Sequence, residues 1–379
     1  MNYAITYKIF EIHIFWSGLM KAVSLFCGAG GMDVGVQNAG FEIVAANELD
    51  PYACKTYREN HKQTTLYEGD IEKNLDAIGM HKGVDLVIGG PPCQGFSVAG
   101  RMDPNDPRSK LVFSYCDVIE RVMPKAFIME NVKALGSLEK FKEIREEIFR
   151  RMSALGYTLS MLILNAKDFG VPQSRERVFI IGLFGKNKPI TYTDFDYKKE
   201  KAISLREAII HLGPAGGEKN SRITKAKITL AEKPVLRKSP YAGMLFNGQG
   251  RPLNPDAWSS TLPASMGGNR TPIIDEGHLY DDMPSWVEEH HRALIEGTKK
   301  AEYGDAPKRL RRLTIDEAII LQTFPNNYIF IGPQSKVFSQ IGNAVPCKLA
   351  QVVAEVVKNK LYKKNQEKHN VHQLPLGIV

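Results

Sequence analysis

Paired cysteines are missing from this 379-residue sequence, although it contains five cysteines. None of them forms a C-x-x-C pair, and they are scattered along the chain at Cys27, Cys54, Cys93, Cys116 and Cys347. This spacing argues against a zinc site and against a disulfide framework, and it fits a reducing cytosol. We therefore expect no metal and a cytoplasmic location.

The N-terminal segment lacks an apolar run long enough to cross a bilayer. Its apolar residues are interrupted by Lys8, Glu11 and His13. It also lacks the continuous apolar core and the small-residue cleavage site of a signal peptide. We interpret residues 1–20 as an extension ahead of a natural start at Met20-Lys21, with a docking segment or a weak signal as the alternatives, and we expect no membrane partner.

Positive charge is in excess and is unevenly distributed. The chain has 50 Lys and Arg against 42 Asp and Glu, a net charge of +8, which indicates a polyanionic partner. Residues 186–312 hold 22 basic and 16 acidic residues, a net of +6, and are rich in Gly, Pro, Ser and Thr. This stretch predicts a nucleic-acid-binding module, and a solvated irregular insertion is the alternative.

Short β-type runs alternate with amphipathic stretches from residue 21 to about residue 185. The runs that predict strands are residues 22–26, 43–47, 86–88, 126–129, 161–164 and 178–183. Apolar residues at three- and four-residue spacing predict helices over residues 52–60, 110–122 and 138–155. This alternation indicates an α/β fold with a doubly wound, mostly parallel sheet that is covered on both faces.

Regular patterning returns after Arg312. Thr314 is followed by acids in what would be the first turn of a helix, as at a helix N-terminus. A last helix is expected over residues 346–361, and residues 363–379 form a polar tail that we expect to be disordered.

A strand, a glycine-rich turn and a helix follow one another at the start of the regular region. Gly28, Ala29 and Gly30 form the turn, where glycines allow close backbone approach and the helix N-terminus offers free N–H groups. Asp33 replaces the third glycine of the dinucleotide fingerprint. Acids at two later strand ends, Glu48 and Asp70, suit ribose hydroxyls. Together they predict an adenosine ligand without a pyrophosphate, although each residue alone could equally be a cap or turn residue.

Cys93 follows an apolar run and the rigid turn Gly89-Gly90-Pro91-Pro92. The two prolines fix φ and hold Cys93 on a stiff loop at the end of a strand, where ligands gather in an open α/β sheet. A lone cysteine is usually a small buried hydrophobe, but this one leaves the apolar run. The context therefore favours a thiolate nucleophile.

Charged residues follow or precede two later strands. Glu130 ends the run at 126–129, where a carboxyl can be held protonated as an acid or can cap the next helix. Arg175 and Arg177 lead into the run at 178–183 and are expected on one face. Guanidinium forks suit a base oxygen and phosphates, and simple surface charges are the alternative. Gly342-Asn343 predicts a tight turn before the last helix.

Six segments, in order, resemble those of the bacterial restriction–modification type of DNA (cytosine-5)-methyltransferase. They are residues 25–31, 90–97, 130–132, 173–177, 312–325 and 340–346, and the resemblance extends from residue 21 to about residue 361. It implies the fold of S-adenosylmethionine-dependent methyltransferases. It also implies a catalytic and cofactor-binding domain (21–187 and 309–362) and a target-recognition domain (188–308), with the extension (1–20) and the tail (363–379) outside both.

The resemblance assigns roles to matching residues. Cys93 would add to cytosine C6, Glu130 would contact N3 and the exocyclic amine, and Arg177 would assist at O2. Arg175 would help to position Cys93 or the DNA backbone, and Pro91 would also touch the flipped base. S-adenosylmethionine would be held by Phe26, Gly28, Gly30, Gly31, Glu48, Asp70, Ile71, Pro91, Asn343 and Val345.

The candidate DNA contacts lie in two regions. Gln94 and Ser97 follow the nucleophile, and Thr261 belongs to a Thr-Leu element typical of recognition domains, where it would contact a phosphate. Arg suits guanine while Asn and Gln suit adenine, so the candidate readers of base edges are Asn247, Gln249, Arg251, Asn269 and Arg270.

We therefore expect a monomeric enzyme that methylates C5 of cytosine within a short double-stranded DNA sequence, through a covalent Cys93–C6 adduct on a flipped base. It would protect host DNA from a cognate restriction endonuclease, a genetic rather than a physical partner. The alternatives are a tRNA cytosine-5 methyltransferase on the same scaffold and an inactive DNA-binding paralogue. A nicotinamide dehydrogenase is disfavoured by the missing third glycine.

Overall fold

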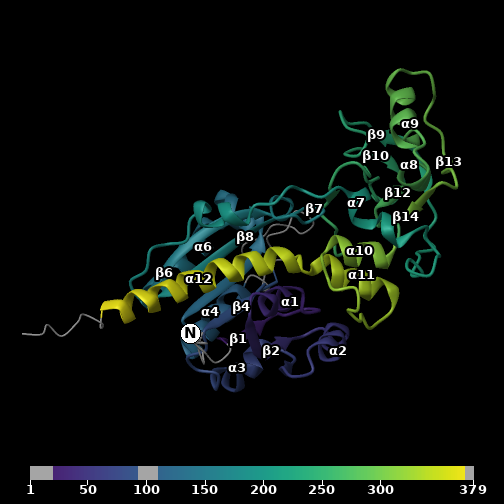
Figure 1. Ribbon diagram of the computed structural model, residues 1–379. Coiled ribbons are helices and arrows are strands. Elements are labelled where there is room, and N and C mark those ends of the chain that lie inside the picture. The colour runs from purple at the N-terminus through teal and green to yellow at the C-terminus, as the bar shows by residue number, and fades with distance from the viewer. Residues whose placement is uncertain (1–19, 93–109, 372–379) are drawn as a thin grey trace, which may run out of the picture.

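The computed structural model describes residues 20–92 and 110–371 of the chain. Its centre is a seven-stranded sheet with the order β3-β2-β1-β4-β5-β8-β6 (Figure 1). The strands are β1 (Met20–Leu25), β2 (Phe41–Glu48), β3 (Thr65–Glu68), β4 (Leu86–Gly89), β5 (Ala126–Val132), β6 (Tyr157–Asn165) and β8 (Glu176–Phe184). The predicted runs all fall within these strands or overlap them, and the α/β class is confirmed.

Within this sheet only β8 runs against the other strands. It pairs antiparallel with both β5 and β6, whereas the β1, β2, β3, β4 and β5 neighbours are parallel. The chain returns from β6 to β8 through a one-turn helix, η3 (Ala166–Asp168), and the two-residue strand β7 (Gln173–Ser174). A connection of this length is too short for a parallel crossover, so the strand must return antiparallel.

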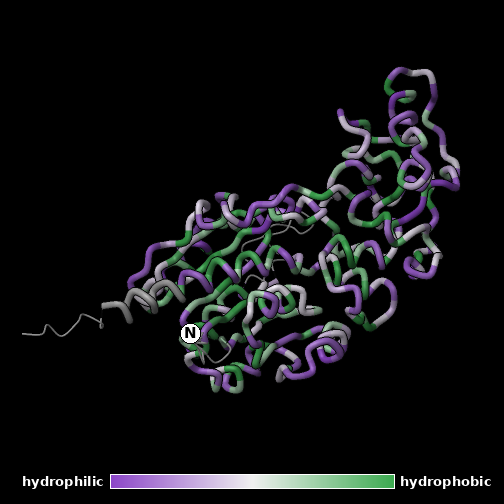
Figure 2. The backbone as a smooth tube through the Cα atoms, viewed as in Figure 1, coloured by the Kyte–Doolittle hydropathy of each residue, from purple (hydrophilic) through white to green (hydrophobic). Residues whose placement is uncertain are grey.

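Helices cover both faces of the sheet, as the alternation predicted. They are α1 (Gly31–Asn38), α2 (Pro51–Asn60), α3 (Ile71–Gly79), α4 (Lys110–Val122), α5 (Lys133–Ser137), η2 (Glu139–Phe141), α6 (Lys142–Ala154) and α12 (Cys347–Val371). One core cluster joins α1 and α12 to the sheet, and a second joins α3, α4 and α6 to its other face. In Figure 2 the sheet interior is mostly hydrophobic. No described helix is long and apolar enough to span a membrane.

The last helix is longer than predicted. Its apolar face is buried against the sheet, at Leu349, Val352, Val353, Val356 and Val357. The expected disordered tail is wrong for residues 363–371, because α12 continues to Val371. These residues include no glycine or proline, and Lys, Gln and Glu favour a helix.

A second, smaller lobe is rich in loops and short strands (Figure 1). Its elements are α7 (Leu205–Ile209), η5 (Ile210–Leu212), β9 (Thr229–Val235), β10 (Met244–Phe246), β11 (Ser259–Ser260), β12 (Ile273–Asp275), α8 (Glu276–Tyr280), α9 (Trp286–Ile295), β13 (Gly304–Asp305), β14 (Leu310–Arg312), α10 (Ile315–Leu321) and α11 (Gln334–Asn343). The expected N-cap at Thr314 is confirmed as a capping box with Glu317.

The packing crosses both expected domain boundaries. Ile190 and Phe195 belong to the core cluster of the sheet and α12, and Lys198 of η4 (Tyr192–Lys198) pairs with Glu355 of α12. On the other side, α10 and α11 share a core cluster with Leu262 and Met266 of the lobe. We propose that the recognition module begins after residue 200 rather than at 188, and that α10 and α11 form its base.

Candidate active site

A glycine loop after β1 opens onto free space at the carboxyl edge of the sheet. Gly28 has φ +55°, and a Cβ built on it would meet no atom of the described residues within 4 Å. A Cβ on Gly30, in contrast, would collide with His61 and Tyr328. Gly28 therefore leaves room for a ligand, whereas Gly30 leaves room for the protein itself. Phe26 also takes a positive φ, of 53°, which turns the chain from strand to loop.

Glu48 is fixed at the end of β2, beside this loop. Its Oε2 accepts a hydrogen bond from the Gly28 amide at 2.7 Å, and its Oε1 accepts from Leu49 at 2.9 Å and Asp50 at 2.7 Å. Burial raises the pKa of the Glu48 carboxyl, and the three amides oppose that shift. A carboxylate offers about four lone-pair positions, so it can accept a hydroxyl as well.

The next strand end carries an exposed acid. Asp70 caps α3 by accepting a hydrogen bond from the Glu72 amide at 3.0 Å. Ile71, the first residue of α3, is buried. Capping fixes Asp70 just beyond Glu68, which pairs with Glu48 across β3 and β2, so the two acids follow neighbouring strands at one sheet edge.

The C-terminal segment folds back onto the glycine loop. A Cβ on Gly31 would lie 2.9 Å from the Val345 carbonyl oxygen, and the Tyr328 hydroxyl donates to the Ala29 carbonyl. Asn343 is the last residue of α11 and is exposed. This contact brings residues about 300 positions apart to one edge of the sheet.

The tight turn expected at Gly342-Asn343 is wrong, because both residues lie in α11. Glycine is needed at 342 for a different reason. A Cβ there would lie 2.6 Å from the Pro263 carbonyl oxygen. Gly342 therefore allows the backbone of the second lobe to cross the helix end closely.

Glu130 and Arg177 form a buried ion pair across β5 and β8. Arg177 Nε lies 2.9 Å from Glu130 Oε1, and their side chains are only 14% and 11% exposed. Burial raises the pKa of Glu130, while Arg177 and Arg175 oppose that shift. A Cβ on Gly90 would lie 3.0 Å from Glu130 Oε2, so glycine keeps this carboxylate oxygen uncovered. Glu130 does not cap the next helix.

Arg175 takes partners different from those of Arg177. Its guanidinium donates to the Leu262 carbonyl at 3.2 Å and to the Gly342 carbonyl at 2.9 Å, and the residue is 2% exposed. Both guanidinium groups nevertheless oppose the upward shift of the Glu130 pKa, so both act on that carboxyl. Arg175 ties the second lobe and α11 to the ion pair.

Cys93, Gln94 and Ser97 lie outside the described residues. The residue two positions before Cys93 is nevertheless anchored. The buried Asn131 amide donates to the Pro91 carbonyl at 3.2 Å, and its Oδ1 accepts from the Val132 amide at 2.9 Å. Asn131 therefore links the end of β5 to Pro91, which precedes Cys93 in the chain. The sequence did not predict that Asn131 would anchor Pro91, although Asn131 directly follows Glu130.

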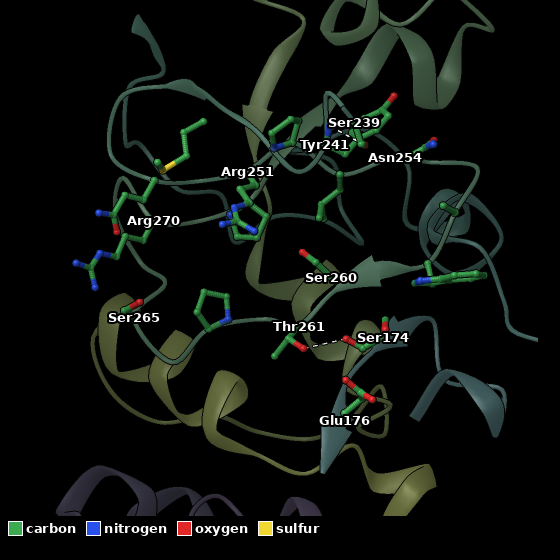
Figure 3. Close-up of a pocket in the computed structure, with 18 residues that line it drawn as sticks. Ser174, Glu176, Ser239, Tyr241, Arg251, Asn254, Ser260, Thr261, Ser265 and Arg270 are labelled. Carbon is green, nitrogen blue, oxygen red and sulfur yellow. Dashed lines mark hydrogen bonds between the residues drawn. The ribbon is translucent and has the colours of Figure 1, made fainter. Parts of the chain in front are cut away.

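A cleft of about 970 Å³ lies mostly among residues of the second lobe and is bordered on the sheet side by Ser174 and Glu176. Figure 3 shows Ser174 and Glu176 on its sheet side, with Arg251 and Arg270 on loops of the lobe. Gln249 and Thr261 also line it, and Thr261 Oγ1 donates to the Ser174 carbonyl at 2.8 Å. Four of the predicted DNA contacts thus line one cleft, but this bond occupies the one hydroxyl donor that Thr261 would offer to a phosphate.

Two other predicted readers of base edges are placed differently. Asn269 is exposed but does not belong to the cleft lining. The Asn247 amide donates to Thr229 Oγ1 and to the Leu230 carbonyl, both at 2.9 Å. Those bonds occupy the donors that Asn247 would need for a base.

Comparison with known proteins identifies the class. The family model for C-5 cytosine-specific DNA methylases matches residues 20–359, and the chain belongs to this family. It is 34% identical over 342 residues to the Type II methyltransferase M1.HphI of Haemophilus parahaemolyticus, covering 88% of this chain and 86% of the relative. It is 33% identical to M.FnuDI of Fusobacterium nucleatum, covering 94% and 99%.

A solved structure supports the same fold. The S. pombe Dnmt2 methyltransferase superposes with a TM-score of 0.63 at 19% identity, covering 91% of this chain and 99% of that one. The family match over residues 20–359 and the two Type II relatives show that the protein is a DNA (cytosine-5)-methyltransferase, and S-adenosylmethionine is its methyl donor. The open space at Gly28 and the fixed Glu48 carboxylate fit the adenosine part of this cofactor.

Asp33 is a further residue of this edge that the sequence did not explain. It lies fully buried in α1, and its carboxylate accepts hydrogen bonds from the Tyr57 hydroxyl at 2.7 Å and the Ser24 hydroxyl at 3.0 Å. Burial raises its pKa from 3.8 to about 6. Asp33 thus holds β1, α1 and α2 together beneath the glycine loop rather than contacting a ligand.

We expect the Asp33→Asn variant to change how stability depends on pH. Between pH 3.8 and about 6 the folded protein binds more protons at Asp33 than the unfolded chain does. This contribution to the free energy of unfolding is therefore present at low pH and lost as pH rises through 6, by roughly 3 kcal/mol. Both proteins should be unfolded with denaturant at several pH values from about pH 4 to pH 7. As pH rises, the free energy of unfolding of the variant should increase relative to that of the wild type. Parallel pH curves would contradict the assignment.

Proposed function

We propose that this enzyme methylates cytosines within one short sequence of double-stranded DNA. The observation that carries this proposal is a cleft with two arginines on the second lobe that reaches Glu176, the neighbour of Arg177 in the chain. Arg251 and Arg270 line that cleft, and among the described residues neither guanidinium makes a hydrogen bond or an ion pair. Unpaired guanidinium groups suit guanine edges and phosphates. A recognition lobe facing a catalytic edge across such a cleft suits a duplex.

The residues of this chain act on the base in a defined order. The target cytosine flips out of the duplex into the sheet edge. The Cys93 thiolate forms a bond to C6, while the Glu130 carboxyl gives a proton to N3 and Arg177 holds O2. The electron pair of the C5–C6 bond then becomes available at C5. A base later removes the C5 proton, and the Cys93–C6 bond breaks.

The cofactor is held by residues around the glycine loop. Phe26, Gly28, Gly30 and Gly31 provide the loop and the start of α1, and Glu48 accepts the ribose hydroxyls. Asp70, Ile71 and Pro91 border the adenine side, while Asn343 and Val345 close the site from the C-terminal segment. When bound, S-adenosylmethionine supplies the electrophilic methyl group that C5 receives.

The biological setting follows from the same proposal. Methylation of one sequence protects host DNA against a cognate restriction endonuclease, which is a genetic and not a physical partner. The enzyme acts as a monomer, and its DNA substrate places it in the cytoplasm. The direct test is bisulfite sequencing of DNA from cells that express it. One methylated sequence supports the proposal, while methylated RNA with unmodified DNA would contradict it.

Arg251→Ala and Arg270→Ala should separate base readers from phosphate contacts. If an arginine holds a guanine edge, its loss should relax one position of the methylated sequence and cost roughly 1–3 kcal/mol in binding. If it contacts phosphate, binding should weaken on all sequences alike. The measurement is methylation of a library of site variants. If a variant keeps both the affinity and the sequence specificity of the wild type, that arginine does not contact the DNA.

A further inference from the structure

Lys167, in η3 between β6 and β7, makes a cation–π contact with an exposed tryptophan of the cleft, Trp258. Lys167 Nζ lies 4.2 Å from the centre of the Trp258 ring. Trp258 lines the cleft and is 44% exposed. Tryptophan is enriched at binding surfaces, where its ring offers an apolar face beside a polar edge.

The backbone fixes both partners. Ser259, next to Trp258, donates its amide to the Pro172 carbonyl at 3.0 Å, and β11 pairs in parallel with β7. Asn165 Oδ1 accepts from the Lys167 amide at 3.3 Å and from the Arg175 amide at 3.0 Å. The lysine, the indole and Arg175 are therefore held by one local network.

Among the described residues, the ammonium group of Lys167 is not neutralised by a carboxylate. The ring of Trp258 is its one side-chain partner in that part of the chain. Lys133 shows the contrast, since it pairs with the cleft residue Glu176 at 2.9 Å and is neutralised there. An aromatic face orders a flexible ammonium group without cancelling its charge. The pair thus presents a pre-ordered positive charge at the cleft edge.

We propose that Lys167, ordered by Trp258, is a DNA-backbone phosphate contact. This inference rests on the proposed function, because it assigns a site for the DNA that the cleft receives. A lysine acts as a point charge with three donors and suits phosphate better than the forked edge of a base. Lys167 lies in η3, whereas Arg251 and Arg270 belong to the second lobe, so phosphate contacts from all three would hold the duplex from two parts of the chain.

The test is the salt dependence of duplex binding by the full-length protein with Lys167→Ala. Each lost phosphate contact should reduce the slope of log K against log[salt] by about 0.9. At moderate salt, affinity should fall roughly 3- to 10-fold, equally on cognate and non-cognate duplexes. Lys82→Ala is the matched control, since exposed Lys82 precedes β4, at the opposite end of that strand from Gly90 and Pro91. It should leave the slope unchanged.

Variants of Trp258 separate the ordering of the lysine from its charge. Trp258→Leu should weaken binding by roughly 2- to 5-fold but retain the wild-type salt slope, because Lys167 keeps its charge. Trp258→Phe should restore most of the affinity. Thermal melting of each variant confirms that it is folded.

The outcomes distinguish this inference from the proposed function. A wild-type slope in Lys167→Ala, with wild-type protein that binds and methylates DNA, overturns the phosphate contact alone. A changed sequence preference in that variant also overturns it, since Lys167 would then contact a base. Wild-type protein that neither binds nor methylates any duplex would instead overturn the proposed function.

Discussion

Replacing Cys93 with alanine is expected to reduce methyl transfer below detection. Cytosine C5 is a poor nucleophile until a thiolate has added to C6, and alanine supplies no thiolate. The measurement is transfer of labelled methyl groups from S-adenosylmethionine to duplex DNA that contains the target sequence. Cys116→Ala is a matched control, because Cys116 is buried within α4. The folded Cys116→Ala protein should retain methyltransferase activity.

A covalent trap makes this prediction decisive. C5 must lose its proton before the Cys93–C6 bond can break, and fluorine at C5 cannot leave in that way. Wild-type protein with S-adenosylmethionine and 5-fluorocytosine DNA should therefore give a complex that survives denaturation, while Cys93→Ala should give none. If the wild type forms no adduct on DNA that it methylates when unmodified, the covalent mechanism is refuted. An adduct that persists in Cys93→Ala would move the nucleophile to another cysteine.

The sequence predicted the sheet well, because most strands are buried and apolar on both sides. The runs at 86–88 and 126–129 became β4 and β5 in adjacent, parallel positions. The direction of β8 was not predictable from its own residues, since a buried strand has the same pattern in either direction. The length of α12 was underestimated because its last turns are polar, so no apolar periodicity indicates a helix there.

Within the site, sequence named individual residues but not their partners. Glu130 and Arg177 were both predicted, whereas their ion pair depends on the register of β5 against β8, where Val132 lies opposite Arg177. From the sequence, Asp33 was noted only as the residue that replaces the third glycine of the dinucleotide fingerprint. Its structural role was not predicted, because its two hydrogen-bond donors, Ser24 and Tyr57, come from other elements. Lys167 and Trp258 are 91 residues apart in the chain, and no local pattern links them.

The setting of Glu130 favours retention of a proton on this carboxyl. Burial favours its protonated form, and the Arg177 guanidinium at 2.9 Å favours the ionised form. The pKa stays above its ordinary value, so a proton is retained at higher pH than on an exposed glutamate. The same guanidinium fixes the orientation of the carboxyl, and Gly90 leaves its second oxygen uncovered.

We therefore expect Glu130→Gln to lower the rate of methylation by about 10²–10⁴-fold, as for loss of a general acid. Glutamine keeps the shape and can accept from Arg177, but it cannot give a proton to N3, so formation of the 5-fluorocytosine adduct should slow by a similar factor. Glu176→Gln is the matched control, because this half-exposed carboxylate lies one residue from Arg177 and pairs with Lys133. Single-turnover rates across pH provide the measurement. Equal losses in the two variants would show that charge in the cleft, rather than proton transfer from Glu130, controls the rate.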